Sequence, residues 1–162
     1  MGAVDFYIQP GGVIGGVYQV TDIIGQGYSA IILKCQDVRS GRVVAVKRFF
    51  PDKMTSQLQA KAYAEPKLNI RSQYVALGEN TFVDNGYINM VMPFVEGESL
   101  RNVLGRYDGI KEVPAVYIGM CIARACIDIH AARILSTDIK PENIIVEPDG
   151  RAKLIDLTCF EL

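Results

Sequence analysis

The residues best suited to chemistry lie in a short segment near the end of the chain. Asp138, Lys140 and Asn143 occur within six residues of one another, and Asp156 follows after a second apolar run. Two carboxylates, one ammonium and one carboxamide form a set that can hold metal-bound phosphates. Taken singly, each has a plainer explanation, because aspartate and asparagine are common turn and capping residues and a lysine is usually a surface charge. Their joint spacing favours a nucleotide site.

Three upstream features could serve the same site. Gly25-Gln-Gly27 is a Gly-x-Gly turn, which by itself is weak support for phosphate binding because such turns are common in hairpins. Lys47 ends an apolar strand, and Ala45 shares its face, so a flat ring could lie against the small side chain while the ammonium reaches phosphates. Glu65 follows at a spacing that lets a helix bring a carboxylate to Lys47.

The elements that must position these residues begin with a β-rich half. Alternating apolar runs separated by turn residues predict a three-stranded antiparallel meander, and a hairpin at Asn85-Gly86 completes a five-stranded sheet. The capping-box pattern Ser56-Gln-Leu-Gln59 opens a helix that carries Glu65, and Pro66 predicts a kink or restart in it. The expected strands are residues 18–24, 30–36, 43–50, 81–84 and 87–95.

An α-rich half follows. A short helix begins at Leu100, and a longer one, with Pro114 in its first turn, runs to about Arg133 and is apolar enough to be buried. Strands 144–146 and 153–155 flank a turn at Asp149-Gly150. Met90, Met92, Ile118, Ile122 and Ile129 are expected in the core, and His130 is expected to be packed or hydrogen-bonded.

Composition limits the other function classes. The chain has 162 residues, of which 49% are hydrophobic, and this suits a globular domain with a substantial core. A net charge of −1 with interspersed signs predicts no nucleic-acid or membrane partner. The apolar stretch 113–123 is too short to span a bilayer. Four cysteines without Cys-x-x-Cys spacing predict free thiols in the cytoplasm.

Together these features resemble the eukaryotic-type protein kinases, from about Tyr18 to the last residue. The Lys-Pro-Glu-Asn string at 140–143 is similar to the Ser/Thr type, and Tyr18-Gln-Val followed by Ile24-Gly is typical of bacterial members. The motifs fall in the family's order: glycine-rich loop at Gly25 to Ile32, strand lysine Lys47, helix glutamate Glu65, catalytic loop at Ser136 to Asn143, and metal-binding Asp156.

The resemblance implies an α+β, protein kinase-like fold. It comprises an N-terminal extension at 1–16, an N-lobe with the five-stranded sheet at 17–94, and a hinge with the beginning of a helical C-lobe at 95–162. It also implies a reaction, the transfer of the ATP γ-phosphate to a serine or threonine hydroxyl of a protein substrate. Asp138 would orient that hydroxyl, Lys140 would neutralise the transferring group, and Asn143 with Asp156 would hold Mg²⁺.

The same resemblance implies an adenine and phosphate site. Lys47 would contact the α- and β-phosphates, and the carbonyl of Pro93 and the amide of Val95 would meet the adenine edge. The other implied cofactor-binding residues are Ile24, Gly25, Gly27, Ile32, Ala45, Glu65, Met92 and Ile145.

The pattern departs from the family at several positions. Ala30 replaces the third loop glycine, and Ser136-Thr137 replaces His-Arg, which removes the arginine that pairs with an activation-loop phosphate in many kinases. Leu157-Thr158 stands where Phe-Gly is usual. The chain ends at Leu162, before the family's activation segment and remaining C-lobe helices, so we expect one face of the helix from Pro114 to be uncovered and to seek a partner.

Three functions therefore stay open. The first is a Ser/Thr protein kinase, for which ATP binding without efficient transfer is expected of this chain. The second is a non-catalytic nucleotide-binding or scaffold module, favoured by Leu157-Thr158. The third is a small-molecule kinase of the same fold, against which Lys140 argues.

Overall fold

The computed structural model describes residues 8–107, 109–157 and 160–161. Contacts divide the chain into two units: the first comprises Met1–Pro66 and Gly78–Phe94, and the second comprises Lys67–Leu77 and Val95–Leu162. The sequence-based division assigned residues 67–77 to the N-lobe. They make their contacts in the second unit because β5 (Val75–Ala76) pairs in parallel with β11 (Ala152–Ile155).

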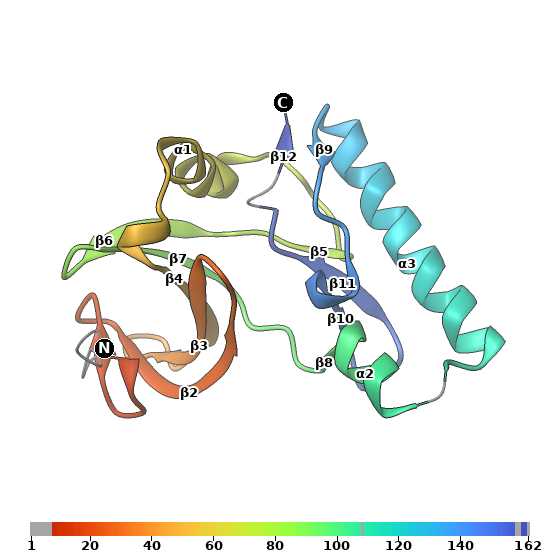
Figure 1. The fold of residues 1–162 in the computed structure, drawn as a ribbon, viewed down its shortest axis with the longest axis horizontal. Coiled ribbons are helices and arrows are strands. Elements are labelled where there is room, and N and C mark those ends of the chain that lie inside the picture. The colour runs from red at the N-terminus through yellow and green to blue at the C-terminus, as the bar shows by residue number, and fades with distance from the viewer. Residues whose placement is uncertain (1–7, 108, 158–159, 162) are drawn as a thin grey trace. The chain divides into compact units, whose positions relative to one another are not determined.

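The first unit is built on one antiparallel sheet (Figure 1). Its strand order is β1-β2-β3-β4-β7-β6. The five expected strands are present, and the two-residue β1 adds a sixth from the segment expected to be an extension. The bounds are β1 Val13–Ile14, β2 Tyr18–Gln26, β3 Ala30–Asp37, β4 Val43–Phe49, β6 Asn80–Asp84 and β7 Tyr87–Pro93.

Turn chemistry accounts for the hairpin between β6 and β7. Asn85 and Gly86 both have positive φ, 49° and 80°, which is the two-residue hairpin geometry that Asn-Gly favours. The two outer parts of the sheet also meet, because the Tyr18 ring stacks on Phe82 with centroids 5.7 Å apart. Gly15 N donates to Asp84 Oδ1 at 3.1 Å, which ties the turn after β1 to the end of β6.

The two faces of this sheet bury different side chains. Val44 and Val46 point into a cluster with residues of β1 to β3, whereas Ala45 and Phe49 join a second cluster that includes Ala62 of α1 (Ser56–Ala64). The alternation follows from the period of two along a strand. Ala45 and Lys47 therefore share a face, as expected, and it is the face that α1 covers.

Helix α1 begins one residue earlier than the capping box at Ser56 predicts. Thr55, and not Ser56, is the N-cap, and its Oγ1 accepts from Leu58 N at 3.1 Å. The proposed capping box with Gln59 is therefore wrong in register. The helix ends at Ala64 and continues as the 3₁₀ turn η3 (Glu65–Lys67), so the change expected at Pro66 is present.

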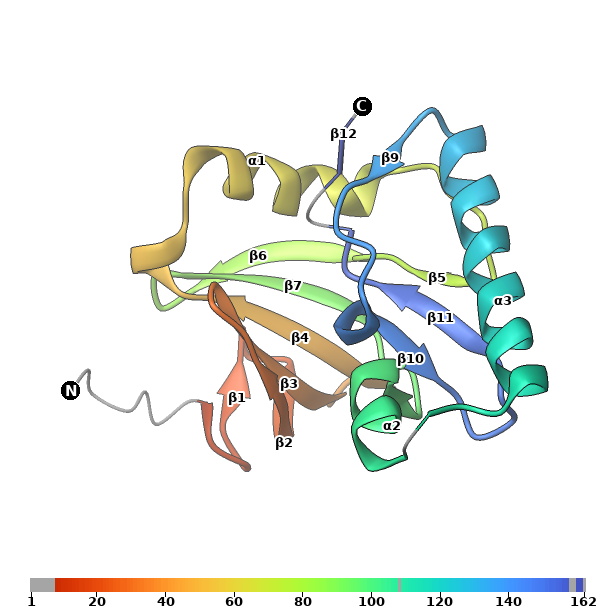
Figure 2. The ribbon, with the colours of Figure 1, turned by 45° about the vertical axis from the view of Figure 1, so that its right-hand side comes forward.

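The second unit combines a small sheet with two helices. The sheet has the order β5-β11-β10-β8, and β9 pairs separately with β12. Helix α3 packs against β11 (Figure 2). The bounds are β8 Glu98–Ser99, α2 Leu100–Arg106, α3 Glu112–Ala131, β9 Leu135–Ser136, η4 Pro141–Asn143, β10 Ile144–Val146 and β12 Phe160–Glu161.

Helix α3 is buried along one stripe only, formed by Ile118, Cys121, Ala125 and Ile129. The expectation of a helix buried nearly all round is therefore wrong, whereas the expected uncovered face is present. Helix α3 has apolar side chains on several of its sides, but the strands of the second unit cover only one of them. Large apolar side chains elsewhere on the helix are exposed, namely Val113, Val116, Tyr117, Met120 and Ile127.

Two further expectations for α3 need correction. His130 is exposed, because it lies off the buried stripe. The helix has 20 residues, longer than the uncharged stretch considered from sequence, and by length and composition it could cross a membrane. That is weak support for a membrane span, because core helices of soluble proteins meet the same criteria.

Candidate active site

The catalytic-loop residues converge around one carboxylate. Lys140 Nζ donates to Asp138 Oδ2 at 2.6 Å, and Asn143 Nδ2 donates to the same oxygen at 3.1 Å. Asn143 Nδ2 also reaches the Asp138 main-chain carbonyl at 2.9 Å. A short turn makes this possible, because η4 closes with a bond from Asn143 N to Lys140 O. The three residues singled out from sequence thus form one hydrogen-bonded cluster.

Exposure distinguishes the members of this cluster. The Asn143 side chain is buried, whereas the side chains of Lys140 and Asp138 are 45% and 33% exposed. The asparagine therefore acts as a fixed support for Asp138. The two charged groups remain accessible to a reactant.

The β10–β11 hairpin brings Asn143 and Asp156 to one end. In the antiparallel register Ile144 lies opposite Leu154, so Asn143 precedes β10 where Asp156 follows β11. Asp156 has φ 63°, a left-handed conformation uncommon for a residue other than glycine. Leu157, next to it, is fully buried. The buried leucine anchors the turn that carries the second aspartate.

A second pairing supports the segments around this end. β9 and β12 pair antiparallel, with Phe160 opposite Ser136 and Glu161 opposite Leu135. The chain before the catalytic loop and the chain after Asp156 are therefore joined by main-chain bonds. Position 158, one of the departures from the family pattern, lies outside the described residues.

The glycine hairpin belongs to the first unit. Gly25 lies opposite Ile32, and Gly27 N donates to Ala30 O at 2.9 Å across the tip. A Cβ at Gly25 would make ordinary contacts with Ile32, the nearest at 3.7 Å, and one at Gly27 would come no closer than 3.8 Å, to Ala30 O. Neither glycine has a positive φ. The chain's own packing does not require glycine at these two positions.

The predicted adenine-contacting residues lie on several strands. On β4, Ala45 is buried and lies opposite Met92 of β7, which is also buried. Ile32 is partly buried, whereas Ile24 is exposed.

Of the remaining three, Pro93 belongs to the first unit, and Val95 and Ile145 belong to the second. Pro93 is the last residue of β7, where it pairs with Val44. Val95 begins the 95–162 part of the second unit. Ile145 lies on β10, opposite Ser99.

Lys47 and Glu65 are both buried within the first unit, at 6% and 0% exposure. Lys47 Nζ lies 5.2 Å from the centroid of the Phe49 ring. Glu65 Oε1 accepts from Gly78 N at 2.9 Å. Burial of two ionisable groups on the face covered by α1 is costly unless each is satisfied. The expected ion pair between them stays a prediction.

The sequence reasoning missed two positions that shape the units. Gly97 has φ 140°, and a Cβ there would overlap the Val146 carbonyl oxygen, so the glycine permits β8 to pair with β10. The sequence signal for this glycine was its position between Glu96 and Glu98 in a predicted turn.

Arg48 is fully buried and contacts Asp84 at 3.3 Å and Asn89 at 3.1 Å. An arginine within an apolar strand, which the register places opposite Asn89, is the sequence signal that could have indicated this buried polar contact.

Comparison with known families decides the classification. The chain matches the family described as "Protein kinase domain" over residues 18–160. The chain belongs to the protein kinase domain family. The resemblance drawn from the ordered motifs is thereby confirmed.

Curated relatives of this kinase domain are Ser/Thr protein kinases, including bacterial ones. It is 27% identical to a probable serine/threonine-protein kinase of Clostridium perfringens, over 90% of this chain and 22% of the relative. It is 29% identical to the serine/threonine-protein kinase PknD of Mycobacterium tuberculosis, over 87% of this chain and 22% of the relative. It is 32% identical to a probable serine/threonine-protein kinase of Streptomyces coelicolor, over 88% of this chain and 22% of the relative. The kinase domain thus spans about a fifth of the length of these relatives.

Solved structures confirm the fold. A kinase-domain crystal structure superposes with a TM-score of 0.85 at 18% identity, covering 95% of this chain and 54% of the other. A structure of Rad53 in complex with AMP-PNP superposes with a TM-score of 0.76 at 24% identity, covering 88% of this chain and 38% of the other. The α+β, kinase-like fold with an antiparallel N-lobe sheet and the start of a helical C-lobe is confirmed.

Proposed function

We propose that this kinase domain transfers the γ-phosphate of ATP to a serine or threonine hydroxyl of a protein. The observation that carries the proposal is the cluster in which Lys140 and Asn143 both donate to Asp138 Oδ2. Family membership and the Ser/Thr kinase relatives support it.

Asp138 would accept the proton of the substrate hydroxyl. Because Asn143 fixes one carboxylate oxygen, the other can turn toward a hydroxyl without loss of that support. Lys140 would leave Asp138 for the transferring phosphoryl group as negative charge develops there. Its exposed ammonium is placed to exchange one anionic partner for another.

The donor set near the β10–β11 end fits Mg²⁺. Magnesium is commonly held by one or two carboxylates together with substrate phosphates, and Asn143 and Asp156 supply one carboxamide and one carboxylate. Among the residues that the structure describes, no group of three or more His, Cys, Asp or Glu could hold a metal. A Mg²⁺ ion would neutralise phosphate charge, and Asn143 would hold Asp138 in place at the same time.

The first unit would contribute the groups that bind the nucleotide itself. Because Gly25 and Gly27 have no side chains, a phosphate could approach the main chain of the loop closely. The packing of the chain itself does not require glycine at either position. Lys47 would contact the α- and β-phosphates. Within this unit, the adenine ring would lie against Ile24, Ile32, Ala45 and Met92, with its edge at Pro93.

Transfer of labelled phosphate from Mg-ATP to a generic basic protein tests the proposal. Asp138→Asn is expected to lower transfer by about 10²–10⁴-fold. The matched control is Asp149→Asn, which alters an exposed aspartate paired with Arg151 in a turn. Equal transfer by Asp138→Asn and the unsubstituted protein would contradict the assigned role.

A second candidate function is a non-catalytic interaction module. The exposed apolar side chains of α3 favour it, because such patches commonly mark partner surfaces. It would give ATP binding without any transfer, in the same assay. A small-molecule kinase is disfavoured by Lys140, which is typical of protein kinases.

A further inference from the structure

Tyr28 at the tip of the glycine hairpin is an unusual surface residue. It lies between β2 and β3 and its side chain is 82% exposed, although it is a large aromatic residue. Lys53 Nζ lies 5.0 Å from the centroid of its ring. Lys53 ends η2 (Pro51–Lys53), the turn that directly follows β4. Figures 1 and 2 show the hairpin tip beside this turn.

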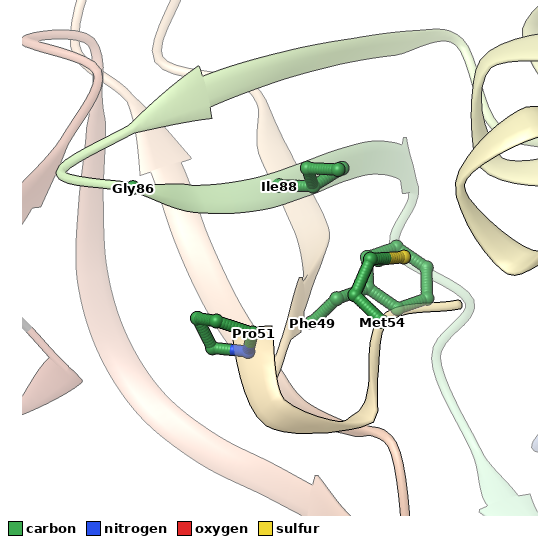
Figure 3. Close-up of a pocket in the computed structure, with 5 residues that line it drawn as sticks. All are labelled: Phe49, Pro51, Met54, Gly86 and Ile88. Atoms are coloured by element: carbon green, nitrogen blue, oxygen red, sulfur yellow. The ribbon is translucent and has the colours of Figure 1, made fainter. Parts of the chain in front are cut away.

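The turn that carries Lys53 is itself well anchored. Phe50 N donates to Ser29 O at 2.9 Å, and Lys53 N donates to Phe50 O at 3.0 Å. Pro51 adds rigidity by restricting its own φ. The shallow cavity beside the turn, of about 200 Å³, is lined by Pro51, Met54 and three residues of β4 and the β6–β7 hairpin (Figure 3). Lys53 therefore projects from a turn that is already bonded to the hairpin tip through Ser29, and its ammonium lies near the exposed Tyr28 ring of that tip.

A cation over an aromatic face is attractive, and at exposed sites its strength is modest. Here it acts on a hairpin tip that contains Gly25 and Gly27, and glycine loses more backbone freedom on ordering than any other residue. Restraining such a loop before a ligand arrives lowers the entropy lost on binding. Asp52 Oδ2 also lies 3.3 Å from Lys53 Nζ.

We propose that Lys53 and Tyr28 form a latch that positions the glycine hairpin for phosphate binding. Lys53 is a positioning residue that acts through Tyr28 and does not contact the nucleotide. This inference rests on the proposed ATP-binding function, but the latch itself can be measured without nucleotide.

Hydrogen exchange in the absence of nucleotide tests the latch. The Gly27 amide donates across the hairpin tip to Ala30, so its exchange reports opening of the tip. Lys53→Met and Tyr28→Leu are each expected to raise its exchange two- to fivefold. The Gly41 amide, which donates to Asp37 at 2.7 Å in another hairpin, is expected to be unchanged.

Conservative variants separate the latch from a general loss of structure. Lys53→Arg keeps the cation and Tyr28→Phe keeps the ring, so both are expected to exchange as the unsubstituted protein does. Arg39→Met, which removes an exposed cation from an aspartate pair elsewhere, should leave the Gly27 amide unchanged. The Tyr28→Leu, Lys53→Met double variant should equal either single variant. Additive effects, or no effect of Lys53→Met, would overturn the latch.

ATP affinity tests the positioning role. Lys53→Met is expected to raise the ATP dissociation constant two- to fivefold with kcat nearly unchanged, and Lys53→Arg should restore it. Faster Gly27 exchange with unaltered ATP affinity would overturn the positioning role. If the unsubstituted protein bound no ATP, the proposed function would fail instead, and the exchange result would still decide the latch.

Discussion

At the residue scale, the buried charged side chains impose the strictest requirements. Glu65 is fully buried and accepts from the Gly78 amide. Arg48 is equally buried and is held by Asp84, Asn89 and the Tyr87 ring, 4.0 Å from its Cζ. A buried ionic group is expensive unless its polar atoms are satisfied, so replacing either partner should cost more than the bond alone contributes.

Glu65→Ala is therefore expected to lower the free energy of unfolding by about 1–3 kcal/mol, because the buried Gly78 amide would lose its acceptor. Glu65→Gln keeps an acceptor oxygen and should cost less. Urea unfolding measures both. Glu79→Gln, at an exposed site paired with Arg42, is the control and should change stability by about 1 kcal/mol or less. Equal stability of Glu65→Ala and the unsubstituted protein would contradict the assigned role.

Thiol reactivity should follow burial. Burial raises the pKa of the Cys35 thiol from 9.0 to about 12. The pKa of Cys35 is higher in the folded state than in the unfolded state, so its contribution to the free energy of unfolding is fully present below pH 9. That contribution is lost as the pH rises toward 12. At pH 8 we expect iodoacetamide to modify the partly buried Cys126 but not Cys35, as measured by peptide mass. Modification of both at the same rate would show that Cys35 is accessible.

At the scale of elements, strand pairing decides which loops meet. The sequence predicted β10 and β11 from their apolar runs and the Asp-Gly turn, and their register then places Asn143 and Asp156 at one end. The parallel pairing of β5 with β11 was not predictable, because a two-residue strand has no periodicity to detect. The α1 cap was misplaced by one residue, since Thr55 and Ser56 are both good caps and only the backbone distinguishes them.

Two glycine substitutions should have opposite effects on the elements of the second unit. Gly97→Ala would place a Cβ against the Val146 carbonyl at a φ that favours glycine, and we expect a loss of about 1–3 kcal/mol. Gly105→Ala, within α2 with no atom near the new Cβ, should gain about 0.5–1 kcal/mol. Thermal or urea unfolding of the two variants checks this. A stable Gly97→Ala protein would mean that β8 does not need this close approach to β10.

At the scale of the whole molecule, ligand linkage offers the broadest test of the nucleotide proposal. ATP with Mg²⁺, at about 100 times its dissociation constant, should add about 2.7 kcal/mol to the free energy of unfolding. Asp138→Asn should retain this stabilisation, because Asp138 is assigned to the substrate hydroxyl and not to the nucleotide. A melting temperature unaffected by ATP, with or without Mg²⁺, would contradict every nucleotide-based function.

The sequence by itself determined the chemistry and the order of the motifs. Residue types and spacings are local properties, so Asp138, Lys140, Asn143 and the Asn85-Gly86 hairpin could be recognised without coordinates. Only the tertiary structure decided that Asn143 and Lys140 share one oxygen of Asp138, that α3 is buried on a single stripe, and that Tyr28 lies under the Lys53 ammonium. The shared oxygen depends on the backbone conformation of the turn η4, which residue spacing alone does not specify. The stripe on α3 and the contact at Tyr28 depend on which segments pack together, and packing is a property of the whole chain that no local pattern contains.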